Sequence, residues 1–182
     1  MRDRTRLVVW QRLDTLGLEY CEIDFSPIRI EGTVTLVDAA GPCAVSYRVA
    51  CDSSGATELA MIRLKREGER IERVITRTSG GAWAIDGTHV PAVDGLADLD
   101  LSVTPATNLL PLHRLRLAPG ESASVTAAWI RFPVIDLVPL AQTYRRIDET
   151  HYEYESSSGF RASLTCDRDG IVQTYGSIWQ RA

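Results

Sequence analysis

The sequence predicts a mainly β protein, in which a strongly curved antiparallel sheet forms an open or closed barrel with one or two short helical segments. Turn signals rich in Gly, Pro, Asp and Ser recur about every 8–12 residues, which is typical of sandwiches and barrels. Between these turns, apolar and polar residues alternate with the period of a half-buried strand. No window of about ten or more residues has a helical period. A β-rich α+β fold is the alternative.

Composition and charge indicate one globular domain over residues 1–182. The chain is 45% hydrophobic and 24% charged, and its formal net charge is −4, values of an ordinary globular protein. Nucleic-acid binding usually needs a basic face, so we expect no nucleic-acid partner.

The N-terminal sequence and the cysteines limit the cellular location and the cofactors that we expect. Leu7 to Trp10 is the only apolar run near the start, too short for a signal peptide, and nothing approaches the roughly 20 apolar residues of a transmembrane segment. We therefore expect a cytoplasmic protein. The four cysteines lack metal-site spacing, so we expect no metal and no cofactor, and we interpret Cys21, Cys51 and Cys166 as small buried hydrophobes.

The first half of the chain predicts a run of hairpins. Alternating segments separated by turn residues predict strands at Leu7–Arg12, Leu18–Phe25, Ile28–Val37, Ala44–Asp52, Glu58–Arg66 and Glu69–Arg77. Two shorter strands follow, Ala82–Ile85 and His89–Ala92, on either side of Asp86-Gly87, a strong hairpin signal.

The stretch from Gly95 to Leu117 organises the rest. Leu99, Leu101 and Val103 share one strand face, and Asp98, Asp100, Ser102 and Thr104 share the other. Pro105 ends this strand because proline lacks an amide hydrogen. Residues 106–111 predict one helical turn or a tight bend with Leu109 and Leu110 inward. Residues 112–117 then predict a strand with Arg114 and Arg116 on one face.

The last third predicts further strands. Ser122–Pro133 is the longest expected strand and carries Trp129 and Arg131 on one face. The segments Ile135–Leu140, Thr143–Asp148, His151–Ser156, Phe160–Asp167 and Ile171–Tyr175 complete the set, with a minor helix over residues 134–142 as an alternative.

Several blocks resemble a bacterial family of putative glycolipid-binding proteins, formerly a domain of unknown function. The main block is DLDLSVTPATNLLPLHRL, residues 98–115; others are WQRLDTLGLEYCEI, EGTVTLVDAAGPCAVSYRVACD and DRDGIVQTYGSIWQR. They follow the family's order over nearly the whole chain. The resemblance implies a curled antiparallel sheet similar to the carriers of bacterial lipoproteins, and a lipid or glycolipid as the ligand.

Seven residues are the candidate ligand-binding set: Arg73, Arg77, Asp98, Asp100, Asn108, Arg114 and Trp129. The arginines suit an anionic head group. Asp98, Asp100 and Asn108 suit sugar hydroxyls, and an indole such as that of Trp129 can stack on a sugar or bury an acyl chain. Exposed arginines that rest their stems on apolar surface, and ordinary packing of the ring, are the alternatives.

These patterns favour a non-enzymatic protein that holds an amphipathic ligand inside the curled sheet. Asp98 and Asp100 have the spacing of an acid–base pair, so a hydrolase acting on glycosides or esters is one alternative. A structural or interaction protein with a solid core is another. Open sheet edges make a homodimer an alternative to a monomer.

Overall fold

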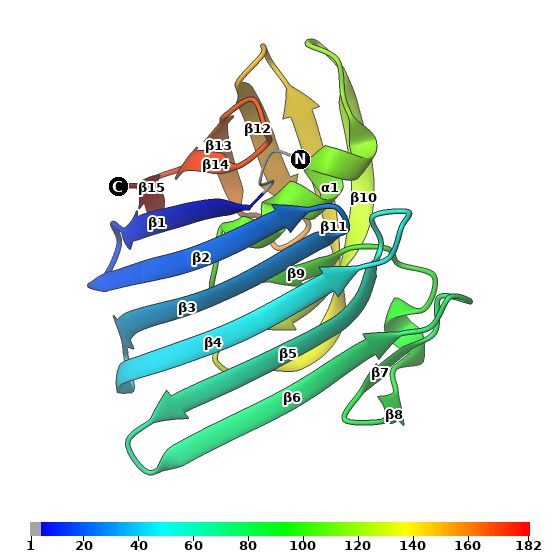
Figure 1. The fold of residues 1–182 in the computed structure, drawn as a ribbon. Coiled ribbons are helices and arrows are strands. Elements are labelled where there is room, and N and C mark those ends of the chain that lie inside the picture. Colours follow the sequence, from blue (N-terminus) through cyan, green and yellow to red (C-terminus); the bar gives the residue numbers. More distant parts are fainter. Residues whose placement is uncertain (1–4) are drawn as a thin grey trace.

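The computed structural model describes residues 5–182. Met1 to Arg4, the first residues of the N-terminal segment that predicts no signal peptide, lie outside the described residues. Within these described residues, all strands belong to one sheet of 15 strands, which curls strongly (Figure 1). Its first half is an antiparallel meander, each strand pairing with the next. This half contains β1 (Arg6–Arg12), β2 (Gly17–Phe25), β3 (Ile28–Asp38), β4 (Gly41–Cys51), β5 (Thr57–Arg66), β6 (Glu69–Arg77), β7 (Trp83–Ile85) and β8 (Thr88–His89).

The chain then crosses to the other edge of the sheet and returns strand by strand. This half contains β9 (Leu99–Leu101), β10 (Ser122–Arg131), β11 (Asp136–Arg146), β12 (His151–Ser156), β13 (Arg161–Cys166), β14 (Val172–Tyr175) and β15 (Trp179–Arg181). β9 pairs parallel with β10, and β15 pairs antiparallel with β1 to join the halves. The strand order begins at β8 and ends at β9, so the barrel is open. The predicted fold class is confirmed.

Strand alternation explains why the predictions for β1 to β6 agree with the structure. In β3, Ile28, Ile30, Gly32, Val34 and Leu36 are buried, and the residues between them up to Thr35 are exposed. The period of two places every second side chain on the inner face of the curl, where it leaves water.

The predicted strand over residues 112–117 is wrong, because the chain is helical there. A 3₁₀ turn, η2 (Ala106–Asn108), leads into α1 (Leu109–Leu115). Pro111 lies in the first turn of α1, where its missing amide hydrogen breaks no helical bond. The spacing of Leu109 and Leu112 also fits a helix, and both are buried. The inward placement predicted for Leu109 and Leu110 is confirmed, since each is 1% exposed.

Smaller differences between the predicted and observed elements lie elsewhere in the chain. β11 is one strand rather than two, and the alternative helix over residues 134–142 is wrong. β10 ends at Arg131, before Pro133, so it is not the longest strand. A 3₁₀ turn, η1 (Pro91–Val93), replaces the end of the strand expected at His89–Ala92. The short strand β15 was not predicted.

The interior of the curl is occupied by the chain itself. Residues 103 to 112 are buried without interruption, and we call them the plug. Figure 1 shows α1 lying between the two halves of the sheet. The plug's Val103, Ala106, Leu109 and Leu110 belong to the main hydrophobic core, and Leu112 packs in a second cluster with Tyr144 and Tyr154.

Gly32 tests the packing of the inner face. Gly32 pairs with Tyr47 across β3 and β4, and a Cβ on Gly32 would lie 2.5 Å from the Tyr47 ring. We expect Gly32→Ala to lower the free energy of unfolding by about 1–3 kcal/mol through overpacking, measured by urea denaturation. Gly80→Ala is the control, because its new Cβ would meet only the Thr78 hydroxyl, at 3.8 Å. Equal losses in both variants would contradict this account.

Candidate functional site

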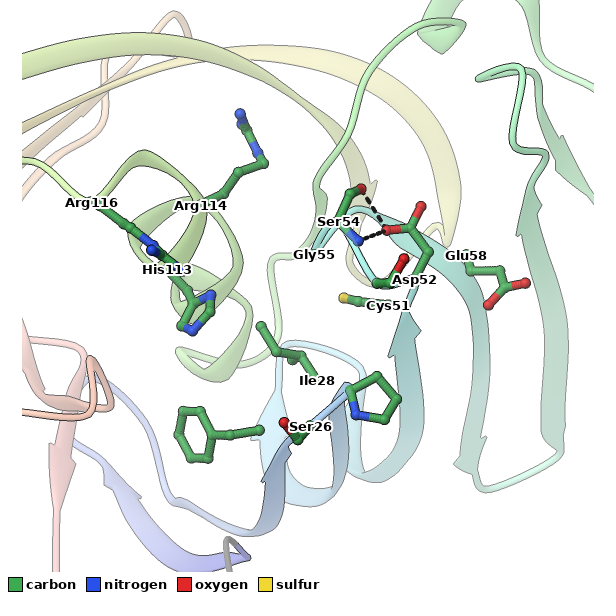
Figure 2. A pocket seen from close by; sticks show the side chains of 13 residues that line it. Ser26, Ile28, Cys51, Asp52, Ser54, Gly55, Glu58, His113, Arg114 and Arg116 are labelled. Carbon is green, nitrogen blue, oxygen red and sulfur yellow. Dashed lines mark hydrogen bonds between the residues drawn. The ribbon is translucent and has the colours of Figure 1, made fainter.

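A cleft of about 900 Å³ opens at one end of the curl. It lies where the β2–β3 turn, the β4–β5 turn and the C-terminal end of α1 meet (Figure 2). Its lining residues are Phe25, Ser26, Pro27, Ile28, Cys51, Asp52, Ser53, Ser54, Gly55, Glu58, His113, Arg114 and Arg116. Phe25, Pro27, Ile28 and Cys51 form an apolar floor, of which Ile28 and Cys51 are buried.

The β4–β5 side of the cleft is acidic, with Asp52 and Glu58. Asp52 Oδ1 accepts hydrogen bonds from the Ser54 hydroxyl at 2.6 Å and from the Ser54 and Ala56 amides at 2.8 and 3.2 Å. The Ser54 hydroxyl, together with these amides, holds the pKa of the Asp52 carboxyl below its usual range. Arg77 Nη1 lies 3.8 Å from Asp52 Oδ2. Asp52 therefore presents a fixed negative charge.

The α1 side is basic, with His113, Arg114 and Arg116. Arg114 donates from Nε to Asp98 Oδ1 at 3.1 Å and from Nη2 to Asp98 Oδ2 at 2.6 Å. The Asp98 side chain is 1% exposed, whereas a third of the Arg114 side chain remains exposed. Hydrogen bonding to Asp98 raises the pKa of Arg114. Asp98 thus fixes the Arg114 guanidinium beside the cleft from behind.

A second polar cluster lies between β9, β11 and η2. Gln142 Nε2 donates to Asp100 Oδ2 at 2.5 Å, and the Tyr144 hydroxyl donates to Asn108 Oδ1 at 2.9 Å. Burial raises the pKa of the Asp100 carboxyl to about 6, against the opposing effect of hydrogen bonds from Gln142 and Thr107. None of these residues lines the cleft.

A third cluster surrounds Glu19, a fully buried carboxyl on β2. Thr104 Oγ1 lies 2.7 and 2.8 Å from the two Glu19 oxygens, and the Tyr47 hydroxyl donates to Oε1. Burial raises the pKa of Glu19 to about 8. The cluster fastens the start of the plug to the sheet wall. Sequence reasoning missed Glu19, although its place among the inward residues Gly17, Cys21 and Ile23 was a signal.

A family model described as "Putative glycolipid-binding" matches residues 7–181. The chain belongs to this family. It is also similar to the crystal structure of a DUF1089 family protein from Pseudomonas aeruginosa, with 30% identity, a TM-score of 0.83, and coverage of 91% of this chain and 92% of that one. No curated protein matches the chain. Within residues 5–182, no helix is both long and apolar enough to cross a membrane.

The structure divides the seven candidate residues of this glycolipid-binding family member. Arg114 lines the cleft, and Asp98, outside the cleft, holds the Arg114 side chain in place through an ion pair. Arg77 reaches the cleft's Asp52 and donates from Nε to the Leu96 carbonyl at 2.8 Å. The remaining four, Arg73, Asp100, Asn108 and Trp129, do not line the cleft.

Two of those four have other surroundings on the sheet. Arg73 on β6 pairs with Asp86 in the β7–β8 turn at 3.4 Å. Trp129 is half-buried on β10, where it pairs with Asp100 of β9 and Val138 of β11. No pattern in the sequence indicates that the β2–β3 and β4–β5 turns meet α1.

Glu19 should make stability depend on pH. Its pKa is about 8 in the folded protein against an ordinary value of 4.5. The folded state therefore loses stability relative to the unfolded state as the pH rises from about 4.5 to about 8. Glutamine mimics the protonated acid, so we expect Glu19→Gln to gain on the order of 2 kcal/mol more, relative to wild type, at pH 8 than at pH 5.

Chemical denaturation at several pH values measures this difference, and the contribution of Asp100 cancels because both proteins contain it. Glu22→Gln is the control, since Glu22 is exposed on the same strand. A Glu19→Gln effect that does not change with pH would refute the assignment.

The Asp98–Arg114 pair should show strong coupling. Arg114→Met leaves the Asp98 carboxylate buried without its cation, so we expect a loss of about 3 kcal/mol in the free energy of unfolding. Asp98→Asn in the Arg114→Met background should recover much of that loss, as a double-mutant cycle by urea denaturation would measure. Arg161→Met, which breaks an exposed pair with Glu155, should cost less than about 1 kcal/mol. Additive effects at Asp98 and Arg114 would rule the coupling out.

Proposed function

We propose that this protein binds an amphipathic lipid or glycolipid in the cleft beside α1 and performs no chemistry on it. The observation that carries the proposal is the cleft itself, about 900 Å³ with an apolar floor between two charged sides. Ligand pockets commonly measure about 300–1,000 Å³ and combine apolar walls with a few polar groups. The family description supports the ligand class.

The proposed site lies at the mouth of the curl rather than deep within it. The plug, residues 103–112, occupies the interior, where the sequence had suggested the ligand. An acyl chain would cover Phe25, Pro27 and Ile28, gaining roughly 0.8 kcal/mol for each buried CH₂. The head group would meet the charged sides of the cleft.

The two candidate catalytic carboxylates already accept hydrogen bonds from other side chains, which supports a binding role. Both Asp98 oxygens accept hydrogen bonds from Arg114, and Asp100 accepts one from Gln142. Neither residue lines the cleft, so a ligand held there does not meet the Asp98–Asp100 pair. The cytoplasmic location and the absence of catalysis stay predictions.

A binding experiment tests the site. The probe is a short-chain glucosyl diacylglycerol with a fluorescent label, titrated with purified protein. We expect wild type to bind it and Phe25→Asp to bind at least about tenfold more weakly, because a carboxylate replaces part of the apolar floor. Circular dichroism checks that the variant is folded.

Leu16→Asp is the matched control. Leu16 is 79% exposed and lines a different apolar groove of about 610 Å³ with Leu18, Val37 and Pro42. We expect this variant to bind like wild type. Failure of wild type to bind both this probe and short-chain phospholipids would overturn the proposed function. Loss of binding in Leu16→Asp alone would move the site to the other groove and overturn the assignment to the cleft.

A further inference from the structure

We propose that the cleft selects a zwitterionic head group, one that carries an anionic group and an ammonium group a few bonds apart. This inference rests on the proposed function and adds the chemical class of the ligand. The arrangement of charges around the cleft and the side chains left without partners support it.

The charges are segregated by element. Figure 2 shows His113, Arg114 and Arg116 on the α1 side, and Asp52 and Glu58 on the β4–β5 side, with Ile28 and Cys51 between them. A head group lying across the floor would therefore meet guanidinium groups at one end and carboxylates at the other.

Two of these charges have no partner in the described part of the chain. Among residues 5–182, neither Arg116 nor Glu58 forms an ion pair or a side-chain hydrogen bond. Some opposite charges on exposed strands do pair across the sheet, as in Arg48–Glu31 at 2.7 Å and Arg161–Glu155 at 2.7 Å. Arg116 and Glu58 instead retain their whole hydrogen-bonding capacity for a ligand.

Arg114 and Asp52 are held by protein partners but keep hydrogen-bonding groups free for a ligand. Arg114 uses Nε and Nη2 on Asp98, which leaves the N–H groups of Nη1. Asp52 uses Oδ1 on the turn, while Oδ2 has Arg77 only at 3.8 Å. Arg114 and Asp52 are thus immobilised, whereas Arg116 and Glu58 can adapt to a ligand. The immobilised side chains lower the entropy cost of binding because they are already ordered.

The backbone at Arg116 has an uncommon conformation, which Asp86 and Ile135 share away from the cleft. Arg116 is the C-cap of α1 with φ 48° and ψ 43°, in the left-handed region. A non-glycine residue there is strained, and glycine is the usual choice just after a helix. The chain nevertheless places an arginine at this position, beside the cleft.

The arrangement ranks head groups by charge. A phosphate would accept charge-assisted hydrogen bonds from Arg114 and Arg116, and an ammonium group would donate to Glu58 and Asp52. A head group that is only anionic would leave the carboxylates unmatched and be repelled by them. A neutral sugar would make only uncharged hydrogen bonds. Selection therefore includes a repulsive element as well as attractive ones.

Three water-soluble amphiphiles test this ranking by calorimetry below their micelle concentrations. They are dihexanoylphosphatidylethanolamine, which is zwitterionic, dihexanoylphosphatidylglycerol, which is anionic, and octyl glucoside, which is neutral. We expect wild type to bind the phosphatidylethanolamine most tightly. Arg116→Gln should weaken binding of both phospholipids about three- to fivefold. Glu58→Gln should weaken the zwitterionic lipid by a similar factor and strengthen the anionic one.

Arg70→Gln and Glu67→Gln are the matched controls. Both residues are exposed near the β5–β6 turn, lie outside the cleft and form no ion pair within residues 5–182. We expect them to bind like wild type. Equal affinity for all three amphiphiles, or the same response in the controls as in Arg116→Gln and Glu58→Gln, would overturn the selectivity while leaving lipid binding intact. Failure of wild type to bind any probe, including the labelled glycolipid, would overturn the proposed function itself.

Discussion

Burial of the plug within the curled sheet is the constraint on which the rest of the structure depends. Residues 103–112 include Thr104, Thr107 and Asn108, polar side chains that must be satisfied away from water. Thr104 bonds to Glu19, Thr107 accepts from the Leu101 amide at 3.1 Å, and Asn108 both accepts from Tyr144 and donates to the Pro105 carbonyl at 3.0 Å. Polar side chains inside the sheet, such as Glu19 and Tyr144, therefore form hydrogen bonds with the plug. This explains why an inner face of alternating apolar residues contains a carboxyl at position 19.

The plug also determines where a ligand can bind. Because the chain fills the interior before it leaves through α1, the last turn of that helix lies at the open end of the curl, facing the β2–β3 and β4–β5 turns. These two turns lie at the same end of the sheet because every second hairpin of an antiparallel meander does. The cleft is thus a consequence of topology, and its charge comes from the side chains that three distant segments bring there.

Sequence reasoning predicted the elements that depend on local alternation and missed those that depend on distant partners. β2, β3 and β6 follow from a period of two, and the inward placement of Leu109 and Leu110 follows from their position after Pro105. The segment from Pro111 to Leu117 alternates as a strand but also spaces its leucines as a helix, so only tertiary contacts decide between the two. The plug's attachment to Glu19 spans 85 residues, and a single sequence carries no signal for such a pair. β15 is three residues long, too short for periodicity to reveal.

Asp98 and Asp100 show the limit of what strand alternation can predict about side-chain roles. Alternation in the sequence predicts that they share one face of one strand and have equivalent roles, but β9 begins at Leu99, so Asp98 lies just before it. In the structure one meets a guanidinium across 16 residues and the other meets a neutral amide across 42 residues. Burial raises the pKa of Asp100 to about 6 because no cation offsets the loss of water. Asp98 instead forms a bidentate pair whose cation extends to the cleft. Two carboxylates in one pattern therefore differ in function: Asp100 contributes to the packing of the plug, and Asp98 positions the basic side of the proposed binding site.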